Sequence, residues 1–289
     1  MTGSGLLLVR CLSFRFMPLE DHIGDICHKA RIQTNTSIEA ATAAAGVDKA
    51  LLHAFETDGM GTASVDIAAL SELLELDVAK SGRIADGWEP ASVDLSLWQQ
   101  LRMVTTAEGF EVNSFLAWDI QSRVAALFDT GWFADDIFKL IDGHDLDLRH
   151  LFITHTHGDH VAAMGPVRKR HPGVRLHSNS EHAPKDQRVT PGESVSVGAL
   201  IVDARLTPGH TSDGVTYVVS GWPGDAPMAA MVGDAIFSGS MGKDFNTPQL
   251  AQQNIREEIL SLPSDTLVCP GHGPLTTIAE EKENNPFFL

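Results

Sequence analysis

Thr154-His155-Thr156-His157-Gly158-Asp159-His160 is the stretch that decides how this chain is interpreted. Three of the thirteen histidines and one aspartate fall within six consecutive positions. Neutral imidazole and carboxylate are ligands that zinc, iron and manganese bind. Histidines so close together would repel one another when protonated unless they shared a cation. The spacing suits two metal ions better than one. His155 and His157, two positions apart, can point the same way, while Asp159 and His160 turn towards a second point.

The segments on either side of this heptad predict a strand-to-helix loop. Residues 150–153 form a short apolar run of strand type, and residues 161–164 are suited to a helix that Asp159 starts. Three later loops follow strand-like runs, where an α/β scaffold carries its chemistry. Each carries a further candidate ligand beside a glycine, which lets the backbone come close to an ion: His210 after 200–202, Asp234 after 228–232 and His272 after 266–268.

Taken in order, the motifs HTHGDH, TPGHT, GDA and PGHG resemble those of the metallo-β-lactamase-fold hydrolases, in the branch of hydroxyacylglutathione hydrolase (glyoxalase II). The resemblance covers about residues 106–289 and includes Phe128-Asp129-Thr130-Gly131, which is similar to the family's D-x-G turn. It implies an α/β fold, an αββα sandwich with the site at one edge between two sheets. Asp129 would orient a ligand from behind. The implied ligands are His155, His157 and His210 for one metal, Asp159, His160 and His272 for the second, and Asp234 as the bridge.

The resemblance implies a hydrolase of a small ester, thioester or lactone with two divalent metal ions. Zinc is preferred, with iron or manganese as alternatives. A hydroxide bridging the two ions would be the nucleophile, because metals lower the pKa of bound water towards ~7. Asp159 is expected to be catalytic as well as a ligand, because it can orient the water or accept its proton. Cys269 is interpreted as a small buried hydrophobe rather than a nucleophile.

Departures from the family patterns bear on the substrate. Full glyoxalase II enzymes carry a C-terminal helical domain with basic residues for glutathione, whereas only 55 residues follow Asp234 here, so glutathione thioesters are not favoured. Lactonases of acyl-homoserine lactones tend to have tyrosine three positions after the bridging aspartate, where this chain has Phe237. Persulfide dioxygenases share the heptad but bind a single iron, and residues 239–245 echo both their loop and that of the generic hydrolases. A mononuclear iron persulfide dioxygenase and a phosphodiesterase therefore stay open as alternatives.

Candidate substrate contacts follow from position alone. Trp132 and Phe133 come directly after the Asp-Thr-Gly turn, where they could line the approach to the site or pack under a loop. Lys243 could pair with a substrate carboxylate or simply be solvated. Tyr217 is expected to be packed rather than catalytic. Three histidines outside every motif are expected at the surface: His171, His177 and His182.

Residues 18–86 predict a small all-α domain whose helical patterns resemble the repressor-type helix-turn-helix. Residues 1–105 contain 8 Lys and Arg against 14 Asp and Glu, which argues against a DNA-binding regulator. The module is instead expected to dock on the catalytic domain, cover its site or form a homodimer. Residues 1–17 are expected to be a leader with Met17 as an alternative start, 87–105 a linker, and 106–289 the catalytic domain.

The bulk properties indicate a cytoplasmic enzyme that acts on a small molecule. A net charge of −17 opposes nucleic acid and anionic membrane partners. Three separated cysteines give no disulfide framework, which suits a reducing compartment. The apolar run at residues 6–9 is too short to span a membrane.

Overall fold

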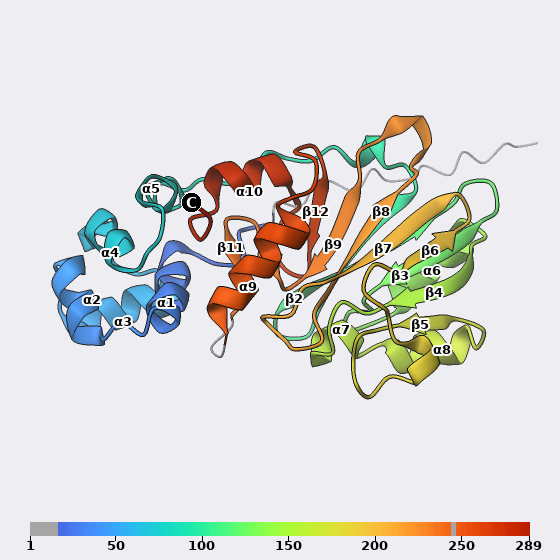
Figure 1. Ribbon diagram of the computed structural model, residues 1–289, viewed down its shortest axis with the longest axis horizontal. Helices are drawn as coiled ribbons and strands as arrows, with labels where there is room; N and C mark the ends of the chain where they lie inside the picture. Colours follow the sequence, from blue (N-terminus) through green and yellow to red (C-terminus); the bar gives the residue numbers. More distant parts are fainter. Residues whose placement is uncertain (1–16, 244–246) are drawn as a thin grey trace, which may run out of the picture.

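Two β-sheets lie face to face in the larger part of the chain, as the computed structural model shows (Figure 1). The structure describes residues 17–243 and 247–289. The expected leader before Met17, and part of the 239–245 segment, lie outside the described residues. The first sheet has strand order β1-β2-β3-β4-β5, in which β3, β4 and β5 run parallel. Its strands are β1 (Leu101–Ala107), β2 (Glu111–Trp118), β3 (Val124–Phe128), β4 (Asp147–Phe152) and β5 (Arg175–His177).

The second sheet has strand order β13-β12-β9-β8-β7-β6, with β9 and β12 parallel. Its strands are β6 (Ser194–Val197), β7 (Leu200–Leu206), β8 (Val215–Ser220), β9 (Ala229–Gly233), β12 (Leu267–Pro270) and β13 (Thr276–Thr277). A separate hairpin follows β9 and consists of β10 (Ile236–Phe237) and β11 (Ser240–Met241).

Successive residues in these strands point to opposite faces, and both faces are apolar. In β3, Phe128 packs between the sheets, while Leu127 packs with the helices outside the first sheet. In β8, Tyr217 packs between the sheets, while Val218 belongs to the cluster outside the second sheet. This alternation requires helical cover on both sides, which makes the fold the expected αββα sandwich.

The outer face of the first sheet is covered by α6 (Asp135–Gly143), α7 (Gly158–Val161) and α8 (Met164–Arg170). The second is covered by α9 (Pro248–Asn254), which continues as a π-helical turn (Ile255–Ile259), and by α10 (Ile278–Asn284). The helix expected to start at Asp159 and run through residues 161–164 is divided into α7 and α8. Pro166 explains the division, because proline lacks an N–H and fits only the first turn of a helix.

Five helices form a unit at one end of the molecule (Figure 1). All but the first begin at a serine or aspartate whose side chain accepts a hydrogen bond from a backbone N–H of the first turn. Gly46, in the left-handed conformation, ends the second helix. The helices are α1 (Ile23–Gln33), α2 (Ile38–Ala45), α3 (Lys49–Asp58), α4 (Ile67–Leu73) and α5 (Val78–Ala85).

This helical unit shares a hydrophobic core with the second sheet. Ile26 and Phe55 belong to the same cluster of buried residues as Val218, Val232 and Val268. Charged side chains also form hydrogen bonds across the interface, such as the one that Lys29 donates to Met241 O. The unit therefore packs on the sandwich, which is the first of the three arrangements that the sequence left open.

The last described residues are part of the same interface. Lys80 donates to the carbonyls of Lys282 (2.9 Å) and Phe288. The Asp77 N–H donates to Pro286 O at 2.9 Å. Phe288 is buried in the shared cluster. Helix α5 is therefore fastened to the segment that follows α10.

The expected linker, 87–105, is too long. Strand β1 begins at Leu101 and pairs along its whole length with β2, so residues 101–105 belong to the first sheet. The strand was not evident from the sequence because its burial does not alternate in a simple way: Leu101 and Val104 are buried while the residues between them are half-buried. A short 3-10 turn at Leu95–Leu97 precedes it.

Candidate metal centre

The histidine-rich heptad is the loop between β4 and α7. The Thr154 N–H donates to Asp129 Oδ1 (2.8 Å) and its hydroxyl donates to Asp129 Oδ2 (2.7 Å). Asp129 lies directly after β3, next to β4 in the sheet, with φ of 53°. The heptad is thus fixed to the end of the neighbouring strand, as its strand-to-helix reading predicts.

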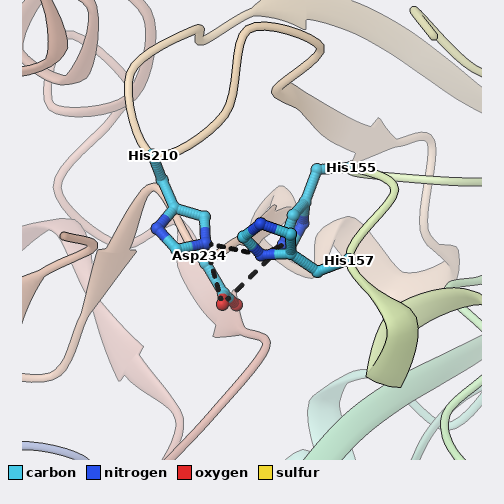
Figure 2. Close-up of side chains that lie close together, drawn as sticks. All are labelled: His155, His157, His210 and Asp234. Carbon is cyan, nitrogen blue, oxygen red and sulfur yellow. Dashed lines mark hydrogen bonds and ion pairs between the residues drawn. The ribbon is translucent and has the colours of Figure 1, made fainter. Parts of the chain in front are cut away.

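The structure brings all seven expected ligands together in two adjoining groups. The ligand atoms within each group lie within 4.8 Å of one another. Figure 2 shows the first group, with three imidazoles and one carboxylate converging from three different loops. The groups are His155, His157, His210 and Asp234, and then Asp159, His160 and His272.

Asp234 is the residue that joins the two groups. Its Oδ2 lies 3.8 Å from His155 Nε2 and 3.5 Å from His210 Nε2, both of the first group. The same oxygen lies 3.4 Å from His272 Nε2, and Oδ1 lies 3.3 Å from His160 Nε2. One carboxylate therefore faces both groups, which is the arrangement that a bridging ligand needs.

Three of the histidines have a hydrogen-bond partner at Nδ1, the ring nitrogen other than the Nε2 that faces Asp234. His160 Nδ1 lies 2.8 Å from Asp129 Oδ2, His272 Nδ1 lies 2.6 Å from Glu111 O, and His210 Nδ1 lies 3.0 Å from Lys243 O. Such partners hold a histidine so that its other nitrogen is free to bind a metal. Asp129, which the resemblance implies would orient a ligand, lies against His160.

The donor set fits bound metal better than a network of hydrogen bonds. Among the described residues, His160 Nε2 and Asp234 Oδ1 are buried and lie 3.3 Å apart, but neither makes a well-aligned hydrogen bond, although a buried polar atom normally has one. A methyl group on Gly271 would lie 2.3 Å from Asp234 Oδ1 and 2.6 Å from His160 Cε1. Glycine is therefore required where the Pro-Gly-His turn closes over these two ligands.

The carboxylates strongly affect the histidines of the second group. Burial opposes a charge on His160, but Asp129 and Asp234 outweigh it and raise its pKa to about 10. Burial likewise opposes a charge on His272, but hydrogen bonds to Asp159 and Asp234 raise its pKa to about 11. The pKa of His155 is held well below its usual value by burial and by the neighbouring His160. In the absence of a bound cation, the positive charge of the second group comes from protons on His160 and His272.

The three expected substrate contacts have different surroundings. Trp132 donates its indole N–H to Phe110 O (3.2 Å) and packs edge-on against that ring. Phe133 is 48% exposed. Lys243 is exposed, and its carbonyl lies 3.0 Å from His210 Nδ1.

Sequence reasoning missed several residues that shape the site. The Phe110 ring lies 5.8 Å from the His272 ring. The Asn113 side chain donates to Pro270 O (3.2 Å) and Gly273 O (3.0 Å), which fixes the turn that carries His272. Glu20, from the helical unit, interacts electrostatically with His272 and Asp234, and its partial burial raises its pKa to about 7. A buried asparagine within an apolar strand was the one local signal among these.

The expectations for residues outside the motifs have mixed outcomes. His177 is wrongly expected at the surface: it is 3% exposed, stacked on Phe152, and its Nε2 lies 3.1 Å from His150 Nδ1. His182 is exposed and His171 half-buried. Tyr217 and Cys269 are buried, as expected. The Tyr217 hydroxyl donates to backbone carbonyls, including that of His177 at 3.1 Å.

Comparison with known proteins defines the class. The family model described as the metallo-beta-lactamase superfamily matches residues 107–272, more than half of the chain. The chain therefore belongs to the metallo-beta-lactamase superfamily, and it is an enzyme of that superfamily. The model begins at residue 107 and does not include the helical unit.

Two kinds of relative are found at equal identity. Hydroxyacylglutathione hydrolase GloC of Haemophilus influenzae is 31% identical over 200 residues, which cover 62% of this chain and 93% of that protein. The mitochondrial persulfide dioxygenase ETHE1 of Homo sapiens is 31% identical over 182 residues, which cover 60% of this chain and 70% of that protein. The crystal structure of ETHE1 from Myxococcus xanthus matches with a TM-score of 0.56 at 30% identity, covering 64% of this chain and 83% of that one.

Among the residues that the structure describes, no helix is both long and apolar enough to span a lipid bilayer.

Proposed function

We propose that the protein is a binuclear metal-dependent hydrolase of a small ester, thioester or lactone. The observation that supports it best is the Asp234 carboxylate, which lies 3.3 to 3.8 Å from the Nε2 atoms of four histidines drawn from both ligand groups. A mononuclear site would leave the second group, Asp159, His160 and His272, buried without a shared cation. The similarity to GloC, a hydroxyacylglutathione hydrolase, agrees with this activity.

Each ligand has a part in the proposed site. His155, His157 and His210 would hold one divalent cation, the second group would hold another, and Asp234 would touch both. Two such cations lower the pKa of water and polarise a carbonyl group. Asp159, whose pKa is held below its usual value because its hydrogen bond to His272 outweighs burial, is placed to orient the attacking water or accept its proton. Exposed His157 marks the side from which substrate approaches.

A mononuclear iron persulfide dioxygenase is the second candidate. The similarity to ETHE1 of Homo sapiens, as high as that to GloC, favours it. The two candidates differ in the number of metals, in the need for oxygen and in the substrate. They can therefore be separated without knowing the natural substrate.

Metal content per chain, measured by elemental analysis on protein purified without added metal or chelator, is the first test. We expect close to two equivalents of zinc, or of zinc mixed with iron or manganese, and hydrolysis of at least one ester, thioester or lactone in a screen. A single equivalent of iron together with oxygen consumption on a persulfide would instead establish the second candidate.

The variant His157→Ala/Asp234→Ala tests the residues. It should lose metal and hydrolysis together, because both groups lose ligands, while circular dichroism remains that of the folded protein. His182→Ala is the matched control, since His182 is exposed and outside the metal centre. Retained hydrolysis in the double variant would remove this site from the mechanism.

A further inference from the structure

The segment that leads into helix α1 packs against the turn that carries His272. A methyl group built on Gly273 would lie 3.0 Å from Glu20 N and 3.3 Å from Glu20 Cβ. Gly273 follows His272 in the chain, so Glu20 rests on the turn that carries this ligand. The helical unit thus contributes a residue beside the proposed active site, across more than 250 positions of sequence.

The Glu20 side chain lies near enough to two ligands to interact with them electrostatically, and it remains accessible. Its carboxylate interacts electrostatically with His272 and Asp234, although the residue as a whole is exposed. No hydrogen bond or ion pair joins its carboxylate to another residue in the part of the chain that the structure describes. An accessible, unpaired carboxylate beside a metal centre is free to meet a group on the substrate.

Lys29, a buried cation near Glu20, is already paired. Lys29 is 3% exposed and donates to Asp21 Oδ2 and to Met241 O at 2.8 Å. Its Nζ also lies 5.2 Å from the centre of the Phe237 ring, which itself packs against His272. The Asp21–Lys29 pair fixes α1 and its preceding segment to the hairpin after β9. Glu20 therefore has a defined position, and its charge is not cancelled by this lysine.

An aromatic ring lies near the same ligand. Phe110 is 55% exposed and its ring centre lies 5.8 Å from that of His272. Trp132 supports it from the side, with ring centres 5.4 Å apart. A carboxylate attracts an ammonium group, an aromatic face adds a cation–π interaction, and the same carboxylate repels an anion.

We propose that Glu20 selects the substrate by charge, so that the group bound beside His272 is uncharged or, preferably, cationic, and an anionic group is disfavoured there. This inference rests on the proposed hydrolase function and narrows its substrate class. The carboxylates of glutathione would then meet a like charge, so glutathione thioesters would be disfavoured.

The test compares three thioesters with the same acetyl group: acetylthiocholine, S-ethyl thioacetate and S-acetyl-3-mercaptopropionate, which are cationic, neutral and anionic at the thiol side. The rate of thiol release is measured at pH 8.5, where Glu20, with its pKa of about 7, is charged. It gives kcat/KM for the wild type, Glu20→Gln, Glu20→Lys and Glu39→Gln. Glu39 is the matched control, because it is an exposed glutamate on α2 of the same helical unit.

We expect the wild type to prefer the cationic substrate, mainly through a lower KM. The ratio of kcat/KM for the cationic over the anionic thioester should fall about 10-fold in Glu20→Gln, equivalent to about 1.4 kcal/mol. The ratio should invert in Glu20→Lys and stay at the wild-type value in Glu39→Gln. An unchanged ratio in both Glu20 variants, with hydrolysis intact, would overturn charge selection and leave the hydrolase proposal standing.

Binding to the cobalt-substituted protein, followed by the thiolate-to-cobalt absorption band, gives a second measurement that needs no turnover. Thiocholine should bind more tightly than 3-mercaptopropionate, and Glu20→Gln should reduce this difference. If none of the thioesters is hydrolysed but this difference is found, the thioesterase form of the proposed function fails and charge selection stands. Equal binding of the two thiols by the wild type would overturn charge selection.

Discussion

Asp129 links three parts of the metal centre through one carboxylate. It accepts the backbone and hydroxyl hydrogen bonds of Thr154 and lies against His160 Nδ1. Asp129→Asn should keep the backbone conformation at this position, because asparagine tolerates a φ of 53°. The asparagine side chain is uncharged, so the ligand His160 would lose its negatively charged partner. We expect one metal equivalent to bind about 10- to 100-fold more weakly, as measured by competition with a chromogenic chelator. Asp145→Asn, at an exposed aspartate with nearly the same φ, is the control; equal weakening in both variants would contradict a specific role for Asp129.

Metal binding should release protons from the second ligand group. The pKa values of His160 and His272, about 10 and about 11, mean that both hold a proton at pH 7 in the absence of metal. A metal can bind only their neutral forms. We therefore expect metal affinity to rise with pH between 6 and 9, with up to about two protons released per chain. Calorimetric titrations in two buffers of different ionisation enthalpy measure this number, and zero protons released would contradict the proposed ligand roles.

Among the elements, the short strand β5 carries a buried histidine that makes the fold sensitive to acid. Burial, with a contribution from His150, lowers the pKa of His177 to about 3, whereas an unfolded chain titrates near 6.5. Above pH 6.5 both states are neutral and the residue has no effect on the pH dependence. As pH falls from 6.5 towards 3, the unfolded state gains a proton that the folded state rejects, so stability is lost by up to roughly 1.4 kcal/mol per pH unit.

His177→Leu should remove that dependence. We expect the free energy of unfolding, measured with urea at pH 7, 5.5 and 4, to fall less steeply in this variant than in the wild type, even if its value at pH 7 is lower. His182→Leu changes an exposed histidine on the following loop and should keep the wild-type slope. Parallel slopes for His177→Leu and the wild type would show that His177 is not the group responsible.

Helix α1 is attached to the sandwich by a buried ion pair. Lys29→Met leaves Asp21 charged and buried without its partner, which should cost roughly 3–5 kcal/mol. The double variant Asp21→Asn/Lys29→Met removes the isolated charge and should recover most of that loss. Denaturant unfolding measures both, with Lys49→Met as the exposed control from the same unit. A double variant no more stable than Lys29→Met would mean that the loss arises from the bond to Met241.

At the scale of the whole molecule, the helical unit and the sandwich should unfold together. Ile26 and Phe55 share one buried cluster with Val218 and Val232 of the second sheet. Separating the two parts would expose this apolar surface to water. We expect a single calorimetric transition whose calorimetric and van't Hoff enthalpies agree. Two resolved transitions would show that the parts are independently stable.

The sequence predicts best those parts of the site whose residues lie close together in the chain. The heptad could be interpreted because His155 to His160 lie within one loop, and the later ligands because each lies beside glycine after an apolar strand. The sandwich follows from the family motifs. The approach of Glu20 to His272 could not be predicted, because it depends on how the helical unit docks. His177 was misjudged because β5 has only three residues, too few to show a period.

The fastening of α5 to the residues after α10 has a consequence for the order of assembly during synthesis. Lys80 and Asp77 leave the ribosome about 200 residues before their partners Lys282, Pro286 and Phe288. Part of the apolar surface of the helical unit therefore stays uncovered on the nascent chain until the segment after α10 has been translated. A stall before that segment would leave this surface accessible to chaperones, so the completion of the helical unit is timed by a segment made much later.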